Sequence, residues 1–467
     1  MRRKAKTGEF AYQAVYRYLL ELIAQMAPGS YSKLPSLRDL SQRLNVSIST
    51  IQYAYSMLEH EGRVQSVPKS GYFARASEVA VQRQPGEDLL QDLQQHTSSA
   101  QMQVFNGAQS LPSLDANLLA IERQLLRQYP RSAGCVHACG ELELRTALAA
   151  RYTHSVQRYW NAEDVYLASD LRSLFEALLA ALELQGCTIV LTSPCSWRLL
   201  RIFQAAGLRV IELALDADGS LDLERFASLL KCEPVRMVML PSRLSSPHGT
   251  LLPQLQYQAI GNLLSQYGVW LLENDLDTEH CFAARPQACL REMVDPQRLL
   301  VFSSLARTVG AEAPYAYLLS RQCPQQLQRQ FLARGFCLPP LRQQAVARLY
   351  AKGRVDVHLE KVRLHLHERV TYLYQQMQAY LGAHLHFHMP VGGATIWAQA
   401  RGLLDSRALF HRLLDQGLVI APGEWFSLQG DYRHHLRLGW PSRSAHDLHG
   451  GLSVLGEALQ RAQKASR

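Results

Sequence analysis

The sequence predicts an α/β protein with a small helical N-terminal part and a large part built on a mostly parallel sheet. Three observations predict this architecture. The chain has 467 residues, which exceeds one ordinary domain. Positive charge gathers in the first 75 residues, where eleven Lys and Arg face five acids, within a chain of net charge +9. Beyond residue 105, short apolar runs alternate with helical patterns, as in a sheet covered by helices.

The first 75 residues hold three helical patterns followed by a hairpin. The helices are predicted over residues 10–23, from the cap residue Ser36 to Asn45, and onward from the cap residue Ser47. Two extended runs then flank a basic turn: residues 63–67 and 71–75 on either side of Pro68-Lys69-Ser70. Three helices and a basic-tipped hairpin predict a winged helix-turn-helix over residues 1–75.

The outward face of the third predicted helix and the tip of the hairpin suit a DNA partner. Ser47 and Thr50 can donate to phosphates or base edges, Gln52 can read a base, and basic side chains can neutralise phosphates. The predicted DNA-binding residues are Ser36, Arg38, Ser47, Ser49, Thr50, Gln52, Tyr53, Lys69, Ser70 and Gly71. We expect double-stranded operator DNA as the partner, because a polyanion also explains the local charge. For each single residue, the alternative is a solvated surface side chain.

The rest of the chain is predicted to be a linker and a two-part α/β domain. Residues 76–105 are rich in Gln and indicate a tether. Helices are predicted over residues 141–152 and 171–184, and buried strands over residues 188–191, 209–213, 235–240, 269–272 and 299–302. This alternation predicts a mostly parallel sheet with helices on both faces. We expect a large subdomain over residues 106–345, then a long helix and a smaller α+β subdomain over residues 346–467.

Three stretches of the N-terminal part carry a family resemblance. Leu34-Pro35-Ser36-Leu37-Arg38-Asp39-Leu40, then Val46-Ser47, then Lys69-Ser70-Gly71-Tyr72-Phe73, together resemble the GntR family of bacterial regulators. The resemblance implies that the third helix enters the major groove while the wing follows the phosphates. The sequence departs from the family at Ile48, where an Arg often stands, and this weakens or re-aims one backbone contact.

Residues 106–467 resemble the fold-type I aminotransferase domain that the MocR subgroup of GntR regulators carries. The matching stretches are Gly140-Glu141-Leu142-Glu143-Leu144-Arg145, Pro194, Pro247-His248-Gly249, Glu273-Asn274-Asp275-Leu276-Asp277-Thr278-Glu279, Pro422-Gly423 and Leu436-Arg437-Leu438-Gly439. The resemblance implies a homodimer that normally binds pyridoxal phosphate (PLP) and uses it to sense a metabolite. We therefore expect a dimer that presents two winged helices to paired half-sites.

The residues that hold PLP in the resembled family are replaced in this chain. Arg307 stands at the place of the Schiff-base lysine, and a guanidinium stays protonated and is no nucleophile. Asn274 replaces the Asp that pairs with the pyridinium nitrogen, and Leu276 replaces the Tyr that contacts the ring hydroxyl. Asp170 falls in the phosphate cradle, where a carboxylate repels phosphate. We expect a degenerate PLP site with no catalytic residues and no covalently bound cofactor.

Two arginines indicate a different ligand for the old cofactor site. Arg437 matches the family arginine that grips a substrate carboxylate, and Arg307 adds a second cation. Two guanidiniums predict a site for a small anionic or carboxylate effector. Three alternatives stay open: Arg437 makes a structural ion pair in a domain that only dimerises, PLP binds non-covalently as effector, or the chain is an active PLP-dependent aminotransferase, which would need a lysine at position 307.

Other kinds of site and location have no support in the sequence. The nine cysteines include no Cys-x-x-Cys pair, so we expect structural thiols and no metal site. No apolar run is long enough to span a bilayer, and the first residues lack the apolar core of a secretion signal. We therefore expect a cytoplasmic protein without a membrane partner.

Overall fold

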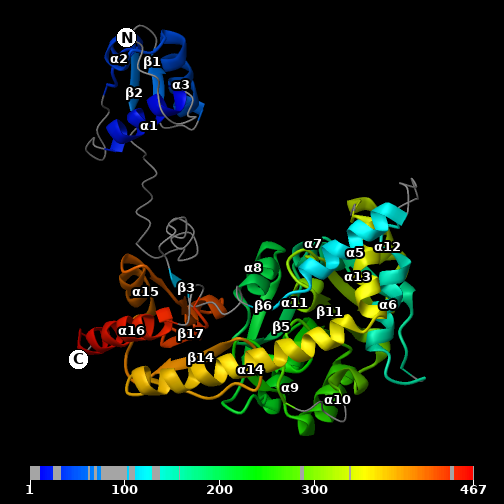
Figure 1. Cartoon of the computed structure of the whole chain (residues 1–467). Helices are drawn as coiled ribbons and strands as arrows, with labels where there is room; N and C mark the ends of the chain where they lie inside the picture. Colours follow the sequence, from blue (N-terminus) through cyan, green and yellow to red (C-terminus); the bar gives the residue numbers. More distant parts are fainter. Residues whose placement is uncertain are drawn as a thin grey trace. The chain divides into compact units, whose positions relative to one another are not determined.

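The computed structural model describes residues 11–24, 33–60, 64–67, 71–74, 103–104, 111–128, 137–156, 158–283, 289–335, 338–441 and 446–465. The chain forms two compact units, Met1–Leu89 and Leu90–Arg467, coloured along the sequence in Figure 1. Within the ranges given above, no helix combines the length and the apolar character needed to cross a membrane.

The described residues of the N-terminal unit form three helices and a hairpin. Its elements are α1 (Ala11–Ala24), α2 (Leu37–Leu44), α3 (Ile48–His60), β1 (Val64–Val67) and β2 (Gly71–Ala74). The core consists of wholly buried side chains from all three helices: Leu19, Leu40, Ile51, Ala54, Tyr55 and Leu58. Asn45 ends α2 in the left-handed conformation, as its predicted role as a helix breaker requires. The predicted winged helix-turn-helix is confirmed, although the turn at residues 68–70 lies outside the described residues.

A seven-stranded sheet organises the second unit. Its order is β4-β12-β11-β10-β7-β5-β6, and only β12 runs antiparallel to its neighbours. The strands are β4 (Val165–Ala168), β5 (Thr188–Ser193), β6 (Arg209–Ala214), β7 (Val235–Pro241), β10 (Trp270–Asn274), β11 (Leu299–Ser304) and β12 (Ala316–Ser320). All residues of β4, β5, β11 and β12 are buried, as expected for strands covered on both sides.

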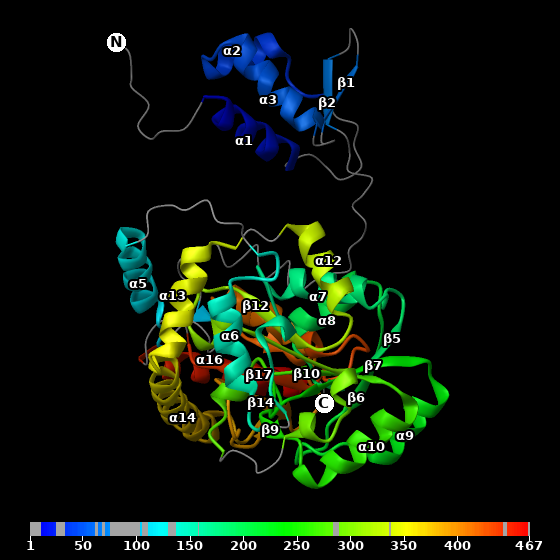
Figure 2. The ribbon, with the colours of Figure 1, turned by 90° about the vertical axis from the view of Figure 1, so that its right-hand side faces the viewer.

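Helices cover both faces of this sheet (Figure 2). On one face, a continuous apolar core joins the sheet to α5 (Asp115–Gln128), α6 (Leu142–Tyr152), α9 (Leu223–Cys232), α10 (Tyr257–Tyr267) and α13 (Pro340–Ala351). On the other face, a second core joins it to α7 (Leu171–Ala181), α8 (Trp197–Ala205) and α12 (Pro324–Arg334). The predicted mostly parallel sheet with two helical layers is therefore confirmed.

A long helix, α14 (Arg354–Leu381), leads into a smaller subdomain. Its antiparallel sheet has the order β13-β14-β17-β16. The strands are β13 (Leu385–Phe387), β14 (Thr395–Ala400), β16 (Ala421–Pro422) and β17 (His435–Gly439), accompanied by α15 (Ser406–Asp415) and α16 (His446–Ala465). Two short pairs complete the strands of the unit: β8 (Leu244–Ser245) with β9 (Thr250–Leu251), and β3 (Gln103–Val104) with β15 (Leu418–Val419). The α+β character predicted for this part is confirmed.

Two predicted boundaries do not coincide with breaks in the structure. The predicted linker runs to residue 105, yet Gln103–Val104 forms β3 and pairs with β15 of the small subdomain. The boundary at residue 345 falls inside α13, where Val346 and Leu349 lie in the core of the large subdomain. A strand of two residues is too short to leave a pattern in the sequence, and the predicted boundary at residue 345 had no helix end to mark it.

Candidate functional site

Hydroxyl groups fix the first turn of α3. The Oγ atom of Ser47 accepts a hydrogen bond from the backbone N–H of Thr50 at 3.2 Å. The same oxygen lies 2.7 Å from Oγ1 of Thr50 and 2.9 Å from Oγ of Ser49. Ser36 plays the matching role for α2 and accepts from the N–H of Asp39 at 3.2 Å. Four predicted DNA-binding residues therefore also build the helix starts that position the motif.

The other described candidates for DNA contact lie on the surface. Arg38, Gln52 and Tyr53 are exposed, and the ring of Tyr53 meets the ring of Tyr12 edge to face with centroids 5.1 Å apart. Gly71 starts β2 with φ +105°, a backbone conformation that favours glycine. The remaining two candidates, Lys69 and Ser70, lie outside the described residues.

In the second unit, Arg307, Arg437 and Asp277 form one charged cluster. The short helix α11 (Leu305–Thr308) follows β11 directly, and the Nε atom of its Arg307 lies 3.7 Å from Oδ1 of Asp277. Burial alone would raise the pKa of Asp277, but Arg307, His280, Ser246 and Arg437 outweigh it and hold the pKa below its usual value. Asp277 therefore carries a negative charge at neutral pH.

Positive charge exceeds negative charge in this cluster. Burial, followed by the charges of Arg307 and Arg198, lowers the pKa of Arg437 to about 10, while Asp277 acts in the opposite sense. The guanidinium carbon of Arg437 also lies 5.1 Å from the ring centroid of Phe426. Arg307 and Arg437 thus both act on the ionised carboxylate of Asp277, and Arg198 adds a further positive charge that acts on Arg437.

Asp170 closes the N-terminus of α7. Its Oδ1 accepts a hydrogen bond from the backbone N–H of Ser173 at 2.8 Å. Its Oδ2 accepts from the hydroxyls of Ser169 and Ser173, each at 3.2 Å. Helix N-termini are common places for phosphates and other anions. At α7 this place is taken by a carboxylate of the chain itself.

Asn274 and Leu276, the other two predicted positions, lie two residues apart at the end of β10. The side-chain oxygen of Asn274 accepts a hydrogen bond from the N–H of Leu276 at 3.2 Å. Leu276 is buried and packs in the core that joins the sheet to α7 and α8. The first side chain is therefore engaged within the chain, and the second contributes only apolar contact.

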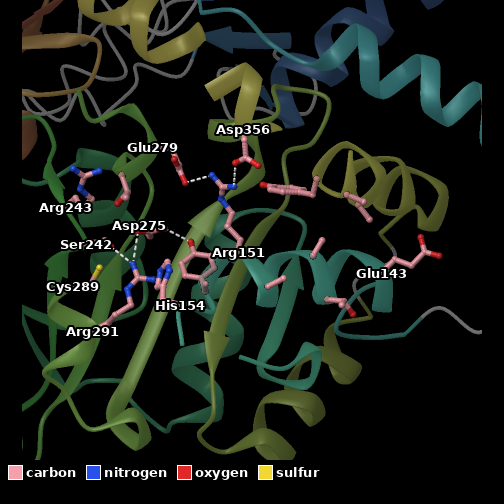
Figure 3. Close-up of a pocket in the computed structure, with 18 of the residues that line it drawn as sticks. Glu143, Arg151, His154, Ser242, Arg243, Asp275, Glu279, Cys289, Arg291 and Asp356 are labelled. Carbon is pink, nitrogen blue, oxygen red and sulfur yellow. Dashed lines mark hydrogen bonds and ion pairs between the residues drawn. The ribbon is translucent and has the colours of Figure 1, made fainter. Parts of the chain in front are cut away.

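A cavity of about 1050 Å³ opens elsewhere in the second unit (Figure 3). Helices α6 and α13 line it, together with segments that follow β7 and β10, such as Ser242 and Asp275. Arg307, Arg437 and Asp170 are not among its lining residues. This cavity is therefore distinct from the predicted cofactor position.

Arg291 anchors a buried charge network in this cavity. Its Nε lies 2.8 Å from Oε2 of Glu273, and its Nη2 lies 3.1 Å from Oδ1 of Asp275. Asp275 also accepts a hydrogen bond from the hydroxyl of Tyr152 (Figure 3 marks this bond). Burial raises the pKa of Glu273 to about 7, because Arg291 opposes the effect only in part and Asp275 adds to it. This network was not predicted from the sequence, where Glu273 and Asp275 were named only as members of the acidic motif of the resembled family.

A second network joins α6 to the helices beside it. Arg151 pairs with Glu279 and, at 2.7 Å, with Asp356 at the start of α14 (Figure 3). The partners come from distant parts of the sequence, and their pairing holds α6, α14 and the segment after β10 together. Across the residues that the structure describes, no group of three or more His, Cys, Asp or Glu could hold a metal ion.

Comparisons with known proteins identify both parts of the chain. Residues 103–452 match the family model of aminotransferase class I and II, and residues 11–73 match that of bacterial regulatory proteins of the gntR family. The chain is 25% identical to YjiR, an uncharacterized HTH-type transcriptional regulator of Escherichia coli (strain K12), over 96% of this chain and 99% of YjiR. It is 26% identical to a second such regulator of that organism, YdcR, over 91% of this chain and 94% of YdcR.

A solved structure shares the fold of the large part. The crystal structure of LysN, the α-aminoadipate aminotransferase from Thermus thermophilus, matches with a TM-score of 0.69 at 19% identity, covering 80% of this chain and 95% of LysN. The same architecture as YjiR and YdcR thus extends over nearly the whole chain, with a DNA-binding head before an aminotransferase-like domain. The chain belongs to the class I and II aminotransferase family, and its gntR-family head makes it a helix-turn-helix transcriptional regulator of the MocR type.

Proposed function

We propose that this regulator binds operator DNA as a homodimer through α3 and its wing, and that its aminotransferase-like domain senses a small carboxylate or related anion without PLP chemistry. The observation that supports the proposal most is that Arg307 pairs with Asp277 in one charged cluster with Arg437. The family resemblance aligns Arg307 with the reactive lysine. A protonated guanidinium is no nucleophile, so it cannot join the cofactor covalently.

The residues around this position do not fit PLP. Asp170 holds the N-terminus of α7, and a second negative charge about 4 Å from it would meet a repulsion of about 4 kcal/mol at an effective dielectric of about 20. Asn274 brings no charge to a ring nitrogen, and Leu276 brings no hydroxyl to a ring oxygen. We therefore assign no catalytic step to this domain.

The same residues suit a smaller anion. Burial, together with the positive charges of Arg307 and Arg198, disfavours the charged form of Arg437. A carboxylate that accepts hydrogen bonds from a guanidinium of this cluster would raise the pKa of Arg437 toward its usual value, since charge-assisted bonds of this kind are among the strongest in proteins. Binding of the carboxylate would then also reduce the repulsion between the arginines.

Thermal unfolding tests the sensing role. We expect at least one small carboxylate from a panel to raise Tm of the full-length protein, by an amount equal to about 2.7 kcal/mol when its concentration is about 100 times Kd. Arg437→Gln should abolish that shift. The control is Arg461→Gln, which removes an exposed arginine of α16 paired with Glu457 at 3.2 Å and should keep the shift. An unchanged shift in Arg437→Gln, or no shift by any carboxylate, would contradict the sensing role.

A further inference from the structure

The first residue of α3 exposes an apolar side chain. Ile48 is 46% exposed, and it is absent from the apolar cluster that forms the core of the N-terminal unit. By contrast, Ile51 and Leu58 on the same helix are wholly buried. The side chain one turn further along from Ile48 is Gln52, which is exposed and polar. Ile48 therefore contributes little to the fold and stands on the surface beside a residue suited to reading bases.

The position of this side chain is fixed before any partner arrives. The backbone of the first turn is held by Ser47, whose Oγ accepts from the N–H of Thr50 and lies close to two further hydroxyls. A β-branched side chain in a helix also has one strongly preferred χ1 rotamer. The methyl groups of Ile48 thus project from a rigid point, and little conformational entropy is lost when they are covered.

The chemistry of the major groove limits what such a side chain can recognise. Base-pair edges in this groove present hydrogen-bond donors and acceptors, and their one apolar group is the 5-methyl of thymine. Isoleucine offers no donor or acceptor, so placing it against the polar edge of a G·C pair would remove water from that edge without replacing its hydrogen bonds. Contact with a thymine methyl has no such cost.

We propose that Ile48 is a specificity-determining residue that contacts the 5-methyl group of a thymine in each operator half-site. This inference rests on the proposal that α3 lies in the major groove. It assigns a base-reading role to the position where the sequence departs from the resembled family, and it names the feature of DNA that the side chain recognises.

The test begins with selection of DNA sites by the full-length protein from a random duplex library. Thymines that are enriched in the half-sites are then replaced one by one with deoxyuridine, which lacks only the 5-methyl group. At one position in each half-site, we expect the replacement to weaken binding about fourfold, the effect of one apolar carbon returned to water. At every other thymine the affinity should stay unchanged.

Variants connect this effect to one side chain. With Ile48→Ala the affinity for the thymine site should fall, and replacement by deoxyuridine at the sensitive position should cost nothing further. The matched control is Gln42→Ala, at an exposed position of α2 outside the predicted DNA-binding residues, which should keep the fourfold sensitivity. Both side chains are exposed, so neither variant removes part of the core.

The possible results distinguish failure of the Ile48 contact from failure of sequence-specific DNA recognition by α3. A selected site at which no deoxyuridine weakens binding, or at which Ile48→Ala keeps the full sensitivity, overturns the contact while leaving DNA recognition intact. A selection that enriches no sequence at all overturns specific recognition by α3 itself, and with it the role of Ile48.

Discussion

Position 307 decides what the cofactor region of this domain can do. An arginine there keeps its charge at every physiological pH, whereas a buried lysine can lose its proton and act as a nucleophile. The guanidinium of Arg307 pairs instead with Asp277, Nε to Oδ1 at 3.7 Å. We propose that this one exchange both removes covalent chemistry and adds a fixed cation to the cluster that contains Arg437.

Restoring the lysine alone should not restore the cofactor. Arg307→Lys is expected to form no covalent PLP adduct at position 307, because Asp170 still repels the phosphate and Leu276 still lacks a hydroxyl. Adding Asp170→Gly and Leu276→Tyr should produce the adduct, detected by borohydride reduction and mass spectrometry of the peptide. Efficient labelling of the single variant would show that Asp170 and Leu276 are no obstacle.

The buried carboxyl of Glu273 makes stability depend on pH. Its pKa is raised to about 7 in the folded protein, against about 4.3 when unfolded. Between these values the folded state binds more protons, so stability falls as pH rises through that window. Glu273→Gln should remove this decline, which amounts to at most about 1.4 kcal/mol per pH unit. Denaturant unfolding between about pH 4 and pH 8 checks this, and equal pH slopes for the two proteins would contradict it.

At the scale of single elements, the cap of α7 can be tested directly. Asp170 accepts from the N–H of Ser173 at 2.8 Å, and loss of such a cap costs about 1 kcal/mol. Asp170→Ala should therefore lower the free energy of unfolding by about that amount, while Asp170→Ser, which keeps a capping oxygen, should recover most of it. If Asp170→Ala is as stable as the wild type in urea unfolding, the carboxylate does not cap the helix.

Elements with strong local signals could be predicted from the sequence. The caps Ser36 and Ser47 and the residue Asn45 place both ends of α2 and the start of α3 to within a residue, because these signals act on neighbouring backbone groups. Strands β4 and β12 lie outside the runs that the sequence predicts to be strands. Both are short and wholly buried, and such runs lack the alternation that distinguishes a strand from a buried helix segment.

The same difference between local signals and tertiary contacts applies to the residues of the candidate site. Arg307, Asn274 and Leu276 could be named because they fall within contiguous motifs of the resembled family. Their partners could not, since the pairing of Arg307 with Asp277 depends on β10 and β11 lying side by side in the sheet. The network of Arg291 with Glu273 also joins distant segments, and no spacing rule connects its members.

At the scale of the whole molecule, a dimer with two heads predicts a steep dependence of DNA binding on salt. Each phosphate neutralised by a basic side chain contributes about −0.9 to the slope of log K against log salt. We expect Arg38→Gln, an exposed change on α2, to reduce the magnitude of the slope by about 2 in a dimer, one unit for each head. Binding isotherms at several salt concentrations measure this, with dimerisation verified by ultracentrifugation. A reduction of about 1 would indicate a single bound head, and no change would remove Arg38 from the interface.

The proposed absence of covalent PLP is tested most directly by PLP titration of the purified wild-type protein, followed by an absorbance spectrum, borohydride reduction and peptide mass spectrometry. We expect no visible band of a PLP–lysine imine and no peptide labelled in stoichiometric yield, because Arg307 cannot react and the four lysines of the large part stand outside the motif: Lys231, Lys352, Lys361 and Lys464. A band fixed by borohydride to one of these lysines in stoichiometric yield would contradict it, and would return this regulator to covalent PLP sensing.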